Sequence, residues 1–332
     1  MLTERPILCP VDFSEQSRQA LRWASAIAQH RRGELTVLSV VEPLLAQAAE
    51  IRLGVDLARA QHEPALREFV EATLPEHLRH DAHVRIEVAV GNASDVILRT
   101  GRRLNAGLIV MGTHGRGGFR KLLVGSTTQE VLHRTEWPVL AVPAGAARDV
   151  DDAGVQLKRI LLATDFRESA MAATQWAADL AFDLGIPLVL AHVVEPVVMP
   201  PRWQALAAEF EGDRMASGQR MLARLSASLR DTHNESVVSV GHPADTIASL
   251  AGEHGAGLVV MGLANSDDSE PRSPGSIAYR VVRMAHVAVV VVPPATSQLP
   301  LRHEELHRFG NERVSNSSSQ FCHSLDAPRD SS

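Results

Sequence analysis

The sequence predicts an α/β protein with two tandem domains, each a five-stranded parallel sheet with helices on both faces. Three observations support this prediction. The chain has 332 residues, which is enough for two domains. Short β-branched apolar runs alternate with amphipathic stretches, a pattern typical of parallel strands joined by helices. The same residue pattern also occurs twice, so each half should carry the same fold.

The internal repeat is clearest in an apolar block of seven residues. AGLIVMG at residues 106–112 recurs as AGLVVMG at 256–262, an offset of 150 with one substitution. Nearer the start of the chain, the Asp-Phe pair at 12–13 recurs at 165–166, an offset of 153. The smaller offset further along indicates that the second half lost three residues in a loop or variable helix.

In the first half, the expected strands are short runs rich in β-branched residues, at 7–11, 35–41, 84–90, 108–111 and 139–142. The expected helices lie between them, at 15–29, 45–72, 94–104 and 126–134. Ser14 is the candidate N-cap of the first helix, and Gly33 lies beyond its end. Pro64 should break or kink the long second helix.

The second half repeats this order. Strands are expected at 160–163, 188–194, 237–240, 258–261 and 287–292, and helices at 169–184, 203–229, 244–254 and 276–285. The last strand of each half is apolar and is followed by a proline, and it would expose unpaired backbone groups if it stayed at a sheet edge. We therefore expect these two strands to pair and to join the halves about a pseudo-two-fold axis.

Composition places the domain boundaries. The first domain is expected at residues 1–146 and the second at 156–294, and the small, polar segment 144–155 is interpreted as a linker. Residues 295–332 are rich in Ser, Asn, Arg, Glu and His without periodicity, so a disordered tail is predicted. An HExxH spacing at 303–307 is interpreted as a charged turn, because the tail offers no core to complete a metal site.

Charge and cysteine content exclude several classes of protein. Lys plus Arg number 33 against 39 Asp plus Glu, a net charge of -6, so nucleic acid is not an expected partner. Two cysteines without a CxxC spacing support neither a disulfide framework nor a zinc site. The chain has no signal-peptide pattern and no long apolar run, so no membrane association and a cytoplasmic location are predicted.

A glycine-rich loop follows the strand at 108–111. Residues 112–126 contain five glycines, which permit positive φ and let backbone N–H groups approach an anion. Arg116, Arg120 and Lys121 add positive charge. Ser126 is placed to cap the next helix, whose N-terminus favours phosphate. The pattern is neither a Walker A motif nor a GxGxxG turn, but it predicts a phosphate cradle.

The spacing Gly112-x2-Gly115-x9-Gly125-Ser126, together with Asp12 at the end of the first strand, resembles the ATP-binding signature of the universal stress protein family. The resemblance covers residues 3–294 and fits the tandem form of the family. It implies two Rossmann-like domains of the adenine nucleotide alpha hydrolase-like type, with ATP and Mg²⁺ as the expected cofactors.

The resemblance also implies roles for single residues. Asp12 is expected to contact the nucleoside, Val40 to lie beside adenine, and Met111 to line the base or ribose. Phosphate contacts are expected from Gly112, Gly115, Arg116, Gly125 and Ser126. From the residues alone, Asp12 could instead cap the following helix, and Val40 and Met111 could be ordinary core residues.

The second half departs from the signature. Gly262-x2-Asn265-x9-Gly275-Ser276 keeps the spacing, but asparagine replaces the second glycine. Its loop carries three acidic residues against one arginine, and this negative charge should repel phosphate. We therefore expect the nucleotide in the first half, at about one ATP per chain.

Three function classes stay open, and nucleotide binding with a stress-response or regulatory role is favoured. The alternatives are a weak ATPase or nucleotidyl-transfer enzyme, and a nucleotide-free dimerisation scaffold. No general base with a metal-ligand set accompanies the loop, so no catalytic or metal residue is assigned. A homodimer of the whole chain stays open.

Overall fold

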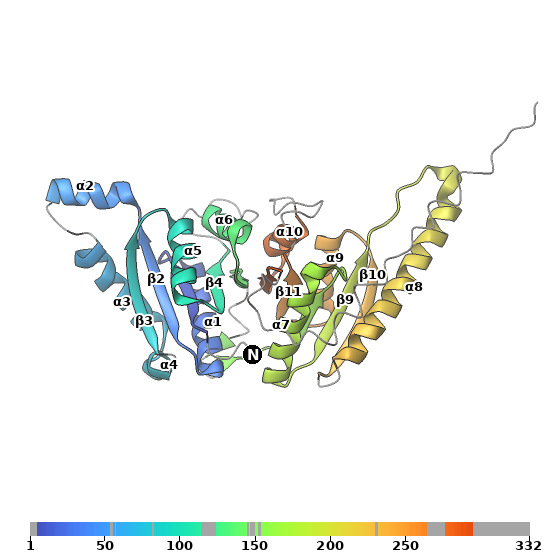
Figure 1. Ribbon diagram of the computed structural model, residues 1–332, viewed down its shortest axis with the longest axis horizontal. Coiled ribbons are helices and arrows are strands. Elements are labelled where there is room, and N and C mark those ends of the chain that lie inside the picture. The colour runs from blue at the N-terminus through green and yellow to red at the C-terminus, as the bar shows by residue number, and fades with distance from the viewer. Residues whose placement is uncertain are drawn as a thin grey trace, which may run out of the picture. The chain divides into compact units, whose positions relative to one another are not determined.

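The computed structural model describes residues 5–53, 56, 58–81, 83–113, 124–144, 146, 150–151, 154–229, 232–263 and 276–294. The chain has the α/β fold that the sequence predicts (Figure 1). Ten strands form one sheet in the order β10-β9-β8-β11-β12-β5-β4-β1-β2-β3. Each half contributes five parallel strands, and the order of the second half mirrors that of the first.

The first half contains β1 (Ile7–Val11), α1 (Glu15–Arg31), β2 (Leu35–Val41), α2 (Pro43–Leu53), the π-helix η1 (Ala58–His62), α3 (Glu63–Thr73), α4 (Glu76–Asp81), β3 (Val84–Val90), α5 (Ala93–Leu104), β4 (Leu108–Gly112), α6 (Ser126–Arg134) and β5 (Val139–Val142). The helical region expected at 45–72, broken or kinked at Pro64, is divided into α2, η1 and α3, and α3 begins one residue before Pro64. Pro64 lies in the first turn of α3, where its missing N–H needs no partner, so it starts a helix there.

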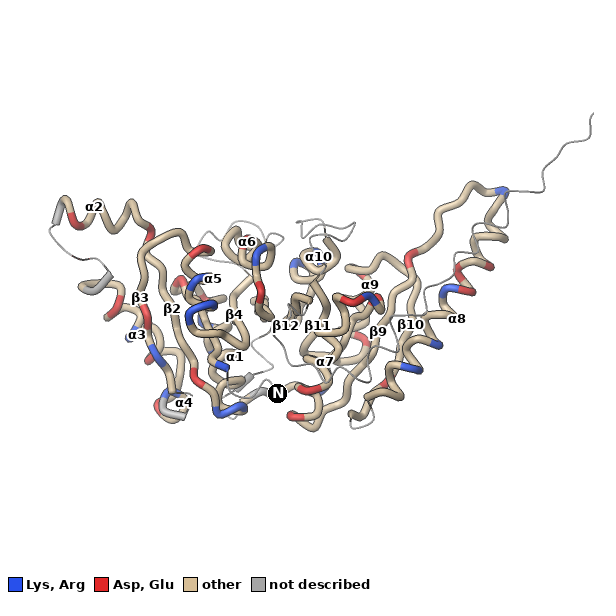
Figure 2. Tube along the Cα trace, in the orientation of Figure 1, with Lys and Arg blue, Asp and Glu red and all other residues tan. Residues whose placement is uncertain are grey.

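The second half contains β8 (Ile160–Ala163), α7 (Glu168–Leu184), β9 (Leu188–Val194), the 3₁₀ helix η3 (Pro201–Trp203), α8 (Gln204–Ser228), β10 (Asn234–Val240), α9 (Pro243–Glu253), β11 (Leu258–Gly262), α10 (Ile277–Met284) and β12 (Ala288–Val292). Charged residues lie along α8, although its first turn has no acidic residue and its last turn no basic one (Figure 2). β10 begins three residues earlier than expected because it lies at the sheet edge, where polar residues are tolerated.

Helix ends follow local chemistry in the sequence. Ser14 is the N-cap of α1, as predicted, and its Oγ accepts a hydrogen bond from the backbone N of Ser17 at 3.2 Å. Arg32 ends this helix in the left-handed region at φ 51°. Asn92 caps α5 in the same way, with Oδ1 accepting from the backbone N of Asp95 at 3.3 Å.

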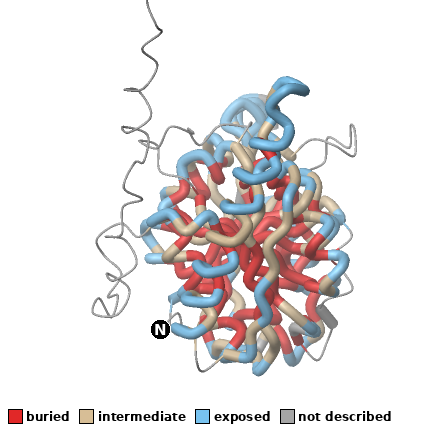
Figure 3. Tube along the Cα trace, turned by 90° about the vertical axis from the view of Figure 1, so that its right-hand side faces the viewer, coloured by how far each residue is buried: buried red, intermediate tan, exposed pale blue. Residues whose placement is uncertain are grey.

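The core has two layers, one on each face of the sheet. Side chains of α1, α3, α7 and α8 pack on one face, and those of α5, α6, α9 and α10 pack on the other. Figure 3 shows buried residues along the strands and exposed residues on the outer helices. The helices therefore hold the carboxyl ends of the strands in fixed positions.

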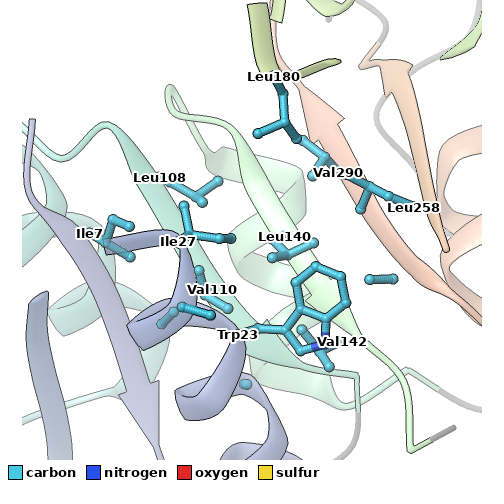
Figure 4. Close-up of a cluster of buried hydrophobic side chains, with 14 of the residues drawn as sticks. Ile7, Trp23, Ile27, Leu108, Val110, Leu140, Val142, Leu180, Leu258 and Val290 are labelled. Atoms are coloured by element: carbon cyan, nitrogen blue, oxygen red, sulfur yellow. The ribbon is translucent and has the colours of Figure 1, made fainter. Parts of the chain in front are cut away.

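The two halves join through their last strands, as the sequence predicts. β5 and β12 pair antiparallel, with Leu140 opposite Val290. These two residues are equivalent in the repeat, so the pseudo-two-fold axis passes between them. Figure 4 shows their side chains in one buried cluster with Trp23 of α1 and Leu180 of α7. Residues Met1–Ala295 accordingly form one compact unit.

The segment between the halves is more structured than the expected linker. β6 (Val150–Asp151) and β7 (Gly154–Val155) pair antiparallel as a short hairpin. The carbonyl of buried Ala146 accepts a hydrogen bond from Trp23 Nε1 at 3.0 Å, and Leu157 is also buried. The segment packs against α1 and is therefore no free spacer. The tail expected at 295–332 lies outside the described residues.

Candidate functional site

The carboxyl ends of β1 and β4 meet where the strand order of the first half reverses. β1 continues through α1 to β2 on one side, whereas β4 continues through α6 to β5 on the other. In open α/β sheets, ligand crevices lie at such points. Val11 pairs with Ser39 in the parallel register, so the residues that follow them, Asp12 and Val40, lie together at this edge.

Pro10 shortens the hydrogen-bonded ladder between β1 and β4. β1 pairs with β4 only at Ile7 and Leu8, whereas the equivalent pair β8 and β11 continues as far as Ala163. Ala163 occupies the position of Pro10 in the repeat. Proline lacks the N–H that a ladder needs, so the β1–β4 ladder ends two residues earlier. A proline inside a central strand is visible in the sequence, so this shortening could have been expected.

Asp12 folds onto the start of α1. Its Oδ1 accepts hydrogen bonds from Ser14, at 3.1 Å from the backbone N and 2.5 Å from Oγ. Phe13, between them, has a φ of 65°, which is rare for a bulky side chain. Phe166 has a φ of 63°, so the second half builds the same turn. The structure thus brings Asp12 to the expected edge and also gives it the alternative role of supporting the helix cap.

Gly112 has a packing reason to be glycine. A Cβ added there would lie 2.9 Å from Gln16 Cβ and 3.0 Å from the Gln16 carbonyl carbon, so the glycine lets α1 approach β4. Neither Gly112 nor Gly125 has a positive φ; that of Gly125 is -57°. The expectation that the loop glycines supply positive φ is therefore wrong at these two positions.

α6 begins at this edge without a side-chain cap. Gly125 is its N-cap, and Ser126, expected to be the cap, is the first helical residue. The Gly125 N–H donates to the Thr113 carbonyl at 2.7 Å, and Thr128 Oγ1 donates to the Gly112 carbonyl at 2.8 Å. These bonds fix the helix start against the end of β4. A helix N-terminus held in this way offers backbone N–H groups and a positive dipole end to an anion.

The remaining predicted site residues differ in their surroundings. Met111 is only 5% exposed and packs in the core with α5 and α6, as the core alternative stated. Val40 is half-buried against the same cluster. Gly115 and Arg116 lie outside the described residues, as do Asn265 and the acidic loop of the second half.

The equivalent edge of the second half carries a different pair of charges. Arg167 stands where the first half has Ser14. Its backbone N donates to Asp165 Oδ1 at 3.0 Å, and its Nε lies 3.6 Å from Asp165 Oδ2. Both side chains are exposed, so this ion pair contributes little stability, but it places a guanidinium against the carboxylate.

The ring that follows the aspartate also packs differently in the two halves. Phe166 lies 4.6 Å from the ring of His192, whose Nδ1 is 2.8 Å from the Thr164 carbonyl oxygen. Phe13 instead makes edge-on contacts with Phe69 and His62, at 5.5 and 5.9 Å between ring centroids. The two halves therefore share the backbone turn at Phe13 and Phe166 but differ in the rings that pack against it.

The residues that the structure describes contain neither a membrane-spanning helix nor a metal-binding cluster. No helix there is long and apolar enough to cross a membrane. Over the same residues, no three His, Cys, Asp or Glu side chains are grouped so that they could hold a metal ion.

Comparison with known proteins identifies the fold and the family. The model of the universal stress protein family matches residues 4–143 and again 156–293. A universal stress protein of Mycolicibacterium smegmatis is 28% identical over 302 residues, covering 88% of this chain and 98% of the relative. One from Mycobacterium tuberculosis is 24% identical over 301 residues, covering 86% and 95%.

Solved structures agree at the level of the fold. The crystal structure of a universal stress protein from Archaeoglobus fulgidus has a TM-score of 0.60 and 23% identity, and it covers 88% of this chain and 97% of that one. The family model covers most of this chain in two successive matches, which correspond to the two halves of the ten-stranded sheet. The chain therefore belongs to the universal stress protein family, with two family domains in tandem.

Proposed function

We propose that the first half binds an adenine nucleotide, ATP with Mg²⁺, at the carboxyl edge of β1, β2 and β4. The protein would act as a nucleotide-binding regulatory protein of the stress response in the cytoplasm. One observation carries this proposal. The uncapped start of α6 lies at the strand-order reversal, at the same sheet edge as Asp12 and Val40.

Each element at this edge suits one part of the ligand. The Asp12 carboxylate can accept hydrogen bonds from the nucleoside, and the half-buried Val40 offers apolar surface to the base. The N–H groups of the first turn of α6, which begins at Ser126, suit phosphate oxygens. Gly115 and Arg116 complete the phosphate end in this proposal, and Mg²⁺ would be held mainly by the phosphates.

The same reasoning disfavours the second half. Its aspartate is paired with Arg167, and its loop sequence is acidic where the first half is basic. A triphosphate would have to overcome this repulsion in the second half, whereas Arg116, Arg120 and Lys121 attract it in the first. We therefore propose about one bound nucleotide per chain.

A matched pair of variants in the full chain tests this proposal. Asp12→Asn keeps an oxygen that can accept from Ser14, so the turn survives while the charge is lost. A hydrogen bond to a charged group is worth about 1 kcal/mol more than a neutral one, so ATP affinity should fall about fivefold. Asp165→Asn, the control at the equivalent position, should change the affinity by less than about twofold in calorimetry.

Two outcomes would contradict the proposal. Equal losses in the two variants would mean that the halves bind alike. Unchanged affinity in Asp12→Asn would remove Asp12 from the site. Mass spectrometry of the small molecules released from denatured wild-type protein should in addition detect an adenine nucleotide.

A further inference from the structure

Tyr279 connects the second half to the candidate site of the first. Its hydroxyl, on α10, donates a hydrogen bond to the backbone carbonyl of Gln129 in α6 at 2.7 Å. The two residues are 150 positions apart and therefore occupy equivalent places in the repeat. Tyr279 is only 4% exposed, and its hydrogen bond to Gln129 is partly buried, so the ring holds the hydroxyl in place beside α6.

The carbonyl that accepts this bond belongs to the first turn of α6. The N–H of Gln129 donates to the Gly125 carbonyl at 2.9 Å, the first bond of the helix ladder. The preceding residue, Thr128, holds the same turn to the Gly112 carbonyl. The start of α6 is thus fixed from its own half by Thr128 and from the other half by Tyr279.

This hydrogen bond has no counterpart of the same kind from the first half to the second. Gln129 has no phenol, so the first half cannot repeat the same bond to α10. The second half therefore supports the first without needing a ligand of its own. The half that supplies this bond is the one whose loop sequence is acidic.

We propose that Tyr279 is a positioning residue for the phosphate end of the nucleotide site in the first half. The proposal rests on the function proposed above. By fixing the first turn of α6, the Tyr279 hydroxyl holds the N–H groups of that turn ready for phosphate oxygens. Donors that are positioned in advance bind more tightly because less ordering remains to be done on binding.

Tyr279→Phe in the full chain tests the proposal, because it keeps the ring and removes only the hydroxyl. ATP affinity in calorimetry should fall about fivefold, the equivalent of a neutral hydrogen bond worth about 1 kcal/mol. Adenosine, which has no phosphates, should bind the variant within about twofold of wild type. This separation distinguishes positioning of the phosphate end from a general loss of structure.

Thr174→Val is the matched control. Its Oγ1 donates to the Ala170 carbonyl of α7 at 2.8 Å, so the variant also loses a buried hydroxyl bond to a helix carbonyl. It should lose similar stability and bind ATP as wild type does. Amide hydrogen exchange at residues 126–129 without ligand should quicken in Tyr279→Phe and stay unchanged in Thr174→Val.

The outcomes separate the two proposals. A wild-type chain that binds no adenine nucleotide overturns both. Wild-type ATP binding together with unchanged ATP affinity and hydrogen exchange in Tyr279→Phe overturns the positioning role alone. Equal weakening of ATP and adenosine, or an equal loss of ATP affinity in Thr174→Val, would also overturn it.

Discussion

Alanine at Gly262 should destabilise the protein, because the added Cβ would meet the backbone of α7. That Cβ would lie 2.8 Å from the Ser169 carbonyl carbon, 3.1 Å from Ala170 Cα and closer still to the Ser169 oxygen. Backbone atoms cannot rotate away as a flexible side chain can. The first turn of α7 must therefore shift away from the end of β11.

The structure also ranks this change against two others. At Gly112 the nearest atoms are 2.9 to 3.1 Å away and include a side-chain Cβ, so alanine there should be tolerated better. Gly212, inside α8, has nothing within 4 Å of the added Cβ. Overpacking costs about 1–3 kcal/mol, so we expect a loss of about 3 kcal/mol at Gly262 and about 2 kcal/mol at Gly112. Gly212→Ala should raise stability by about 0.5–1 kcal/mol.

Urea unfolding followed by circular dichroism measures all three variants on one scale. With an m-value of about 3 kcal/mol/M, Gly262→Ala should move the midpoint down by about 1 M, and Gly212→Ala should move it up slightly. A Gly262→Ala variant as stable as wild type would refute the reasoning, since it would mean that α7 has room that the structure does not show.

Two further predictions concern buried groups. Burial lowers the pKa of Arg31, whereas the negative charges of Asp183 and Asp179 raise it. The Nε and Nη2 atoms of Arg31 are buried and have no hydrogen-bond partner. Arg31→Leu, which copies the equivalent Leu184, should leave the free energy of unfolding unchanged or raise it by about 1 kcal/mol, and a loss above about 2 kcal/mol in urea titrations would contradict this. Burial raises the pKa of Cys9, so the thiol keeps its proton in the folded protein. The contribution of the Cys9 thiol to stability therefore falls as the pH rises above about 8.5, the pKa of a cysteine in the unfolded chain. In a Cys322→Ser background, Cys9 should therefore react with iodoacetamide at pH 8 only after denaturation; rapid alkylation of the native protein would show that the site opens.

The strands were predictable from the sequence because their signals are local. β1, β2, β3, β5, β8 and β9 have the predicted bounds, since each is a short β-branched run between turn residues. The repeat added long-range information, because two equivalent apolar strands with proline after each predicted the β5–β12 junction. The start of α1 was equally visible, because Ser14 is a typical N-cap residue.

The region after β2 was not predictable, because its signals conflict. α2 exposes Leu44, Leu45 and Ile51, so its apolar residues do not mark a buried face. Pro64 suggests a break in a long helix and is in fact compatible with the first turn of α3. α4 has only six residues, too few to show a period.

Some features of the candidate site were likewise predictable from the sequence and others were not. The resemblance to the family signature led to Asp12, Val40 and the start of α6, and the strand register brings the first two together at one edge. Spacing could not reveal that the missing Cβ of Gly112 faces Gln16, because a glycine signature is the same whether a ligand or a helix comes close. Nor could it reveal the bond from Tyr279, which depends on how the two halves pack.

The number of ATP molecules bound per chain tests the central claim most directly. Calorimetric titration of the full chain with ATP and Mg²⁺ should give a stoichiometry of about one. Both α6 and α10 begin without a side-chain cap, but the loop sequence before α6 is basic and the one before α10 is acidic. Two equivalent sites would show that Arg167 and the acidic loop do not prevent binding in the second half. The absence of any binding would contradict the assignment of a nucleotide site to the first.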